Sequence, residues 1–248
     1  MTRDVSPEPR EFDCRIILLG GFGVCLNNTY VRVPSDAIRL LAFLALRSER
    51  VPRSFVAGSL WAERDEERAF GNLRSALWRL RSVSDLLVES DQQALAITSL
   101  VKVDLWDAIA SARFLDTRSD DESKLPPLDM FTSELLPGWY DEWVLLDRER
   151  HRQRSLHALE QLSVRLLERE MYGAAIQAAL AAVAQDPFRE SSQRLLISIH
   201  LREGNYSEAR RHYEQYRQIL YDELAVGPSP LLQRLIDEAT GGAMALAD

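Results

Sequence analysis

The C-terminal half of the sequence contains an internal repeat with a period of 34 residues. Tyr172 recurs as Tyr206, and Ala175 recurs as Ala209. Small residues at these offsets let paired helices approach closely, and repeats of this length form units that stack on their neighbours. An Asp-Pro pair at 186–187 closes the first copy, because proline cannot continue a helix. The repeat therefore predicts an α-helical region built from stacked units.

The spacing matches the second helix of a tetratricopeptide repeat. The match is degenerate, because Ala179 stands where an aromatic side chain is usual. Helical periodicity dominates from Asp104 onward, so we predict an all-α, tetratricopeptide-like domain over residues 104–240 and a short tail at 241–248. Arrays of this kind bind proteins or peptides on a concave surface, which indicates a module for partner binding or self-association.

A polar, proline-ended loop is expected at 118–127, and a long charged helical stretch at 139–170. In this stretch arginines alternate with acidic residues, a pattern that usually marks a solvated helix face. We therefore expect four arginines to face water: Arg148, Arg150, Arg152 and Arg154.

Residues 14–103 show a different order of elements. Apolar runs around Gly20-Gly21 and Asn27-Asn28 predict short strands joined by turns. Three helices follow, and two short strands at 86–88 and 94–97 then form a hairpin around a polar turn. This is the order of a winged helix-turn-helix of the response-regulator-like kind. The predicted fold class is therefore mainly α with a small β component: a polar tail at 1–13, a winged helix-turn-helix domain at 14–103, and the all-α domain after it.

The third of these helices carries the strongest functional signal. Its segment 68–81 (RAFGNLRSALWRLR) holds four arginines and no acidic residue, in a chain of formal net charge -8. Arginine pairs bidentately with guanine or phosphate, and asparagine pairs with adenine. An ordinary amphipathic helix with solvated arginines would show the same pattern, so the flanking sequence has to decide. The apolar face, at 100° per residue, is formed by Leu73, Ala76, Leu77 and Leu80.

The excess negative charge lies outside this first domain. Residues 1–100 hold 13 basic and 13 acidic residues, whereas residues 101–248 hold 17 basic and 25 acidic residues. Since the local field attracts phosphate, the balance permits DNA binding. Arg53, before the second helix, and Gln92 and Gln93, on the hairpin, are candidates for phosphate contacts, although the hairpin carries Glu89 and Asp91 instead of arginine.

Several classes of protein are excluded. Two cysteines in 248 residues do not form a disulfide framework and fit a reducing cytoplasm. No apolar run approaches the ~20 residues that span a bilayer, and the N-terminus lacks an apolar signal core. The four histidines lack metal-site spacing, and no nucleophile motif occurs. We therefore expect a cytoplasmic protein that is not an enzyme, needs no cofactor or metal and does not bind a membrane.

Taken together, the two halves resemble the SARP family, the antibiotic regulatory transcription activators of actinobacteria. The resemblance covers residues 14 to about 240 and is most specific in three segments: 72–81 (NLRSALWRLR), 136–143 (LPGWYDEW) and 223–230 (ELAVGPSP). The second and third are similar to signatures of the bacterial transcriptional activator domain. The chain lacks the Gly-x-x-x-x-Gly-Lys-Ser/Thr motif of longer relatives, so it resembles their short form and should bind no nucleotide.

The resemblance implies a transcriptional activator that binds direct repeats in promoters of biosynthetic operons and recruits RNA polymerase with its sigma factor, with possible self-association on the DNA. It places one set of residues on the groove-facing helix: Asn72, Arg74, Ser75, Trp78 and Arg79. Arg68 and Arg81 are expected to contact phosphate instead. The Trp78 indole has an alternative position, packed against the first or the second domain.

A protein-interaction scaffold whose winged helix no longer binds DNA is the alternative function. The acidic hairpin favours it, as do the acids that precede the third helix: Glu63, Asp65, Glu66 and Glu67. Arg74, Arg79 and Arg81, on a helix segment without acids, favour DNA binding.

Overall fold

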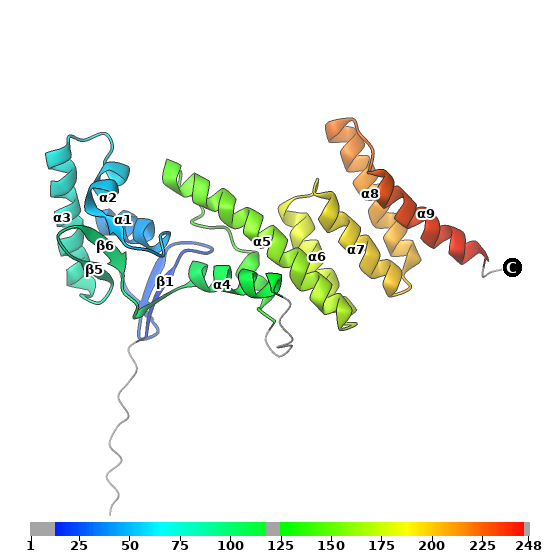
Figure 1. Cartoon of the computed structure of the whole chain (residues 1–248), viewed down its shortest axis with the longest axis horizontal. Helices are drawn as coiled ribbons and strands as arrows, with labels where there is room; N and C mark the ends of the chain where they lie inside the picture. The colour runs from blue at the N-terminus through cyan, green and yellow to red at the C-terminus, as the bar shows by residue number, and fades with distance from the viewer. Residues whose placement is uncertain (1–12, 118–124, 246–248) are drawn as a thin grey trace, which may run out of the picture. The chain divides into compact units, whose positions relative to one another are not determined.

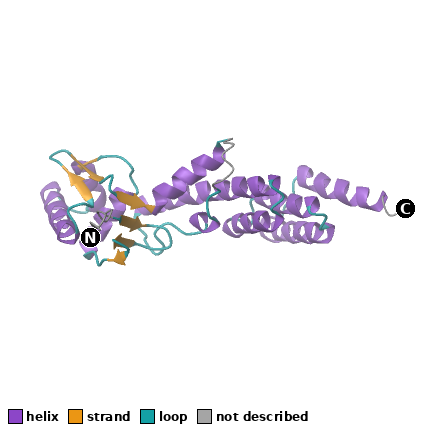
Figure 2. Cartoon of the chain, turned by 90° about the horizontal axis from the view of Figure 1, so that it is seen from below, coloured by secondary structure: helices purple, strands orange, loops and turns teal. Residues whose placement is uncertain are grey.

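A computed structural model describes residues 13–117 and 125–245 of the chain (Figures 1 and 2). These residues form two compact units. The N-terminal unit comprises Met1–Ala110 and Glu134–Glu149, and the helical unit comprises Ser111–Ser133 and Arg150–Asp248. The expected polar tail at 1–13 lies, apart from residue 13, outside the described residues, as does most of the loop expected at 118–127.

The N-terminal unit begins with a four-stranded sheet of order β3-β2-β1-β7. Its strands are β1 (Cys14–Ile17), β2 (Gly23–Leu26), β3 (Thr29–Tyr30) and β7 (Val101–Val103). Asn27 and Asn28, with φ of 49° and 62°, form the two-residue turn between β2 and β3, as the sequence predicts. The sequence does not predict β7, which pairs parallel to β1 and returns the chain to this sheet.

Three helices and a second sheet complete the winged helix-turn-helix. The helices are α1 (Ser35–Ala45), α2 (Arg53–Leu60) and α3 (Glu66–Val83). The hairpin of β5 (Val88–Ser90) and β6 (Ala94–Ile97) follows α3, and β4 (Val51–Pro52) pairs with the other side of β6. Figure 2 shows these strands beside the helices. The predicted order of strands, three helices and hairpin is confirmed.

The segment 134–149 belongs to the N-terminal unit, although the sequence places the domain boundary at 103/104. The backbone of Leu136 donates to the carbonyl of Leu18 at 2.8 Å, and Leu135 forms an isolated bridge with Leu19. Trp143 packs edge-on against Phe43, with ring centroids 5.2 Å apart. The segment joins this unit because its aromatic side chains complete the N-terminal core.

Arg148 does not face water as expected. Its guanidinium group donates to three backbone carbonyls, those of Leu135, Leu136 and Trp139, and its side chain is only 19% exposed. The turn that these carbonyls belong to contains Leu136, with φ of 44°, and Gly138, with φ of 79°. The Leu136 carbonyl also accepts a hydrogen bond from the Trp139 backbone at 3.2 Å, and the planar guanidinium supplies a donor to all three carbonyls at once.

The helical unit is built from consecutive helices. They are α6 (Tyr172–Gln185), α7 (Glu190–Arg202), α8 (Tyr206–Leu224) and α9 (Pro230–Ala245), and each packs against the next. Three elements precede them in the chain: α4 (Asp104–Asp116), the short 3₁₀ helix η1 (Leu128–Phe131) and α5 (Glu142–Glu168). Helices α4 and α5 have residues in both units. Helix α9 continues to Ala245, past the boundary at residue 240 after which a short tail is expected from the sequence.

The sequence repeat corresponds to a repeat of backbone geometry. Tyr172 and Tyr206 are the first residues of α6 and α8, and Ala175 and Ala209 are fully buried. The residue two positions before each tyrosine has a positive φ, 58° at Glu170 and 84° at Gly204. The same tight turn therefore precedes both helices, and an alanine five positions after the positive-φ residue allows close packing.

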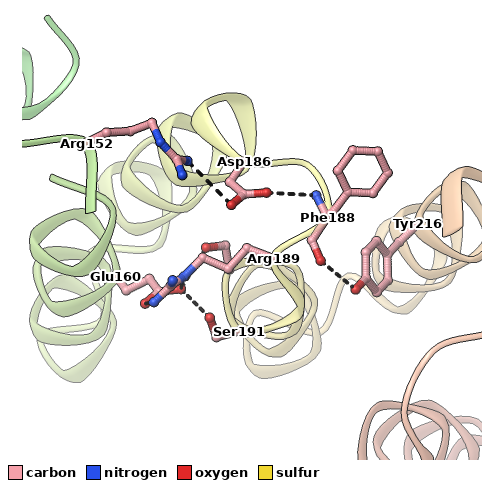
Figure 3. Close-up of polar contacts among 8 residues, drawn as sticks. Arg152, Glu160, Asp186, Phe188, Arg189, Ser191 and Tyr216 are labelled. Atoms are coloured by element: carbon pink, nitrogen blue, oxygen red, sulfur yellow. Dashed lines mark hydrogen bonds and ion pairs between the residues drawn. The ribbon is translucent and has the colours of Figure 1, made fainter. Parts of the chain in front are cut away.

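A buried carboxylate connects α5 to the turn between α6 and α7 (Figure 3). Glu160, 8% exposed, accepts two hydrogen bonds from Arg189, at 2.9 and 3.0 Å, and further bonds from Ser191 and Ser192. Burial raises the pKa of Glu160, but these donors outweigh it and hold the pKa below its usual value. In the same turn, Phe188 accepts a hydrogen bond from the Tyr216 hydroxyl of α8 at 3.2 Å. The Asp-Pro pair thus ends α6 inside a polar network that joins three helices.

Candidate nucleic-acid interface

Helix α3 is held in place by its N-terminal cap and by its apolar face. Asp65 caps the N-terminus by accepting a hydrogen bond from the Arg68 backbone at 2.9 Å, and Glu66 and Glu67 lie in the first turn, where acids suit the helix dipole. Its buried residues are Ala69, Leu73, Ala76 and Leu80. Leu77 is half-buried at the edge of this face. Asp65, Glu66 and Glu67 therefore stabilise the start of the helix.

The opposite face of α3 is exposed and carries most of the predicted site. Asn72, Arg74, Ser75, Trp78 and Arg81 are all exposed. The Trp78 side chain is 71% exposed, so it is not packed into the protein core. Ser75 turns its hydroxyl back to the carbonyl of Gly71, at 3.0 Å, and so satisfies its donor within the helix. Arg74 and Arg81 have no carboxylate partner among the residues that the structure describes.

Two predicted site arginines are already engaged. Arg79 forms an ion pair with Asp36 of α1 at 2.8 Å, with the two side chains 44% and 45% exposed. Arg68 pairs with Asp65 at 3.4 Å, where both side chains are largely exposed. Surface pairs of this kind are weak, typically below about 1 kcal/mol, so both arginines can exchange their carboxylate for a phosphate.

Two arginines from outside the hairpin β5–β6 contact its turn. Arg53, at the start of α2, donates to the Ser90 hydroxyl at 2.9 Å and to the Asp91 carbonyl at 3.1 Å. Arg50 forms an ion pair with the Asp91 carboxylate. The Asp91 carboxylate also accepts hydrogen bonds from the backbones of Ala94 and Gln93, and these bonds, with Arg50, hold its pKa below the usual value. The acidic hairpin turn is therefore neutralised locally.

Arg50 was missed in the sequence because its position depends on strand pairing. Strand β4 pairs with β6 through Val51 and Leu95, which brings the residue before the strand to the hairpin. Gln92 and Gln93 are exposed at the same turn. The two-residue run Val51-Pro52 is too short to predict as a strand.

Other kinds of site find no support in the residues that the structure describes. Within 13–117 and 125–245, no group of three histidine, cysteine, aspartate or glutamate side chains is arranged to hold a metal ion. The described helices include none that is long and apolar enough to cross a membrane.

The chain is similar to known regulatory proteins. Residues 126–239 match the model of the bacterial transcriptional activator domain. The regulatory protein AfsR of Streptomyces coelicolor is 29% identical over 220 residues, which cover 84% of this chain and 22% of AfsR. Both similarities agree with the resemblance of the sequence to the SARP family. Segment 136–143, which resembles a signature of the activator domain, lies within the matched region but packs in the N-terminal unit.

The solved structures show the same fold. Mycobacterium tuberculosis EmbR, solved in complex with a low-affinity phosphopeptide, superposes with a TM-score of 0.70 at 18% identity, covering 94% of this chain and 66% of EmbR. At this identity the likeness extends to the fold alone. The chain spans about a fifth of the length of AfsR and just under two thirds of the EmbR chain.

Proposed function

We propose that this chain is a transcriptional activator of the SARP family and that it binds specific duplex DNA by inserting α3 into the major groove. One observation carries the proposal: the exposed face of α3 presents Asn72, Arg74 and Arg81 with no acidic residue between positions 68 and 81, over a fully buried leucine and alanine face. A rigid helix with guanidinium and amide groups on its outer face has the donors that read guanine and adenine edges. The local charge matches phosphate even though the chain as a whole is acidic.

We assign different DNA contacts to the arginines of this surface. Arg74, which is exposed and has no carboxylate partner in the described part of the chain, is assigned to base contact, and Arg81, in the last turn, to phosphate. Arg79 and Arg68 would first release Asp36 and Asp65, so their net contribution should be smaller than that of Arg74. Arg53 is assigned to phosphate next to the hairpin.

The test is binding of the purified full-length chain to duplexes selected from its own upstream region. Arg74→Ala should weaken binding to the specific site by roughly 1–3 kcal/mol and relax the preference at one base pair. Arg81→Ala should weaken binding equally on all sequences and lower the slope of log K against log salt by about one unit. Arg154→Ala, an exposed arginine of the helical unit, is the matched control and should change neither.

The activation step is proposed from the family. Protomers side by side on promoter direct repeats would require repeat centres about 10–10.5 bp apart. The helical unit is then the surface for RNA polymerase with its sigma factor, and a pathway-specific role in secondary metabolism follows for the operon controlled. In transcription with purified polymerase, the wild-type chain should raise transcript yield from a promoter with the repeats, and Arg74→Ala should abolish the increase.

The pairing of Arg79 with Asp36 and of Arg68 with Asp65 favours one alternative, a scaffold whose winged helix no longer binds DNA. A scaffold would retain no duplex in a salt-dependent manner. Failure of every upstream duplex to bind would therefore reject the DNA-binding proposal and leave the scaffold.

A further inference from the structure

Trp78 lies at the centre of the exposed face of α3 and is 71% exposed. Residues three and four positions away are its neighbours on the helix, which places Arg74 and Arg81 on either side of it. An indole held in water between two arginines gains little for folding, since it removes almost no apolar area from solvent. Its contribution is therefore expected in a complex.

Gly71 and Ser75 precede Trp78 on the same face of α3, and this strip of the face has little polar character. One turn before the indole is Ser75, whose hydroxyl is bonded to the carbonyl of Gly71 and does not point outward. Gly71 has no side chain, and a Cβ atom at this position would have only an Arg74 guanidinium nitrogen nearby, at 3.8 Å. Two small residues followed by a large aromatic one allow the helix to approach a partner closely and project the indole toward it.

The chemistry of the major groove identifies what the indole can contact. Base edges there present hydrogen-bonding atoms, and the one apolar group among the four bases is the 5-methyl group of thymine. On the assumption that the DNA-binding function proposed above is correct, we propose that Trp78 packs against a thymine methyl group and so specifies a T·A pair at one position of the site. The indole is then a specificity-determining residue, and Arg74 and Arg81 anchor the helix on either side of it.

The charge of the surroundings favours a duplex over a protein partner. Arg74 and Arg81 lie one turn before and one turn after the indole, and segment 68–81 holds no carboxylate. A protein occupying this face would need a strongly acidic surface, whereas duplex DNA supplies both phosphates and methyl groups within one groove.

The experiment uses the full-length wild-type chain and the best duplex recovered by selection from a random-sequence pool. Each thymine of the site is replaced in turn by deoxyuridine, which lacks only the methyl group. One position should lose affinity by about fourfold, the value for one buried methyl-sized group. At that position deoxycytidine should bind weakly, and 5-methyldeoxycytidine should recover part of the loss, because it restores the methyl without the thymine carbonyl.

Two variants assign the effect to the indole. Trp78→Ala should bind the thymine and deoxyuridine duplexes equally, whereas Trp78→Phe, which keeps an aromatic ring, should still prefer thymine. Because Trp78 is exposed, both variants should unfold at denaturant concentrations close to that of the wild type.

Three outcomes would overturn the inference. If no deoxyuridine substitution weakens wild-type binding, then the methyl group is not read, and this result needs no variant. If Trp78→Ala retains the deoxyuridine penalty, then another residue reads the methyl. In both cases specific DNA binding itself stands. If selection enriches no duplex at all, then the DNA-binding proposal fails first and this inference with it.

Discussion

Replacing Arg148 with alanine removes the donor that closes the turn at residues 135–139. The guanidinium donates to the Leu135 carbonyl at 2.9 Å, to the Trp139 carbonyl at 2.8 Å and to the Leu136 carbonyl. Leu135 and Leu136 are fully buried, so the truncation leaves carbonyls that water reaches poorly. We therefore expect the N-terminal unit to lose a large part of its stability, although residue 148 lies on α5 outside the predicted winged-helix domain.

The magnitude follows from the three bonds. A hydrogen bond to a charged group contributes about 1.5–3 kcal/mol, and the ion pair to the half-exposed Glu134 adds little. Because the Arg148 side chain is 19% exposed, we take the lower end and expect a loss of about 4 kcal/mol. Compared with the 5–15 kcal/mol of an ordinary domain, this is a severe defect. With a urea m-value of about 2 kcal/mol per molar, the midpoint should fall by about 2 M.

Tryptophan fluorescence is the appropriate assay, because all five tryptophans of the chain lie in the N-terminal unit. Arg81→Ala, at an exposed arginine of the same unit that has no carboxylate partner among the described residues, is the matched control and should lower the free energy of unfolding by less than about 0.5 kcal/mol. Arg148→Met keeps the alkyl stem and should lose nearly as much as alanine, which separates hydrogen bonding from packing. If Arg148→Ala unfolds at the same urea concentration as Arg81→Ala, then the guanidinium does not stabilise the turn at residues 135–139 and this interpretation is wrong.

Two further predictions concern the helical unit, followed by circular dichroism. Glu170→Gly should raise the free energy of unfolding of this unit, and Gly204→Ala should lower it, each by about 1 kcal/mol. Both positions have a left-handed φ, which is unfavourable for any residue with a Cβ atom. A change of the same sign in both variants would contradict this. His200 and His212 stack at 5.2 Å, and burial lowers the pKa of both below 6.5, so the unit should lose stability as the pH falls below about 6.5, where the unfolded state binds more protons. His200→Phe should reduce this acid sensitivity, and an unchanged pH profile would refute the assignment. The charged and titratable groups that act on the pair are Glu203, Glu208 and Arg211.

The helix at 68–81 and its two faces were predictable because their signals are local. Helical spacing places leucines and alanines on one side and arginines on the other, whatever the rest of the chain does. The acids that precede the helix are explained in the same way, since Asp65 caps it from three residues before Arg68. The repeat period of the helical unit is likewise a property of neighbouring residues, and it reappears as the paired turns at Glu170 and Gly204.

Only the tertiary structure decided which arginines of the candidate interface are free. Asp36 and Arg79 are far apart in the sequence, and Arg50 reaches Asp91 only through the pairing of β4 with β6. The assignment of 134–149 to the N-terminal unit is of the same kind, because Trp143 meets Phe43 across a hundred residues of chain. Residue order determined the elements and their faces through short-range periodicity and capping. Contacts between distant segments depend on how those faces pack, and no local pattern of residues encodes them.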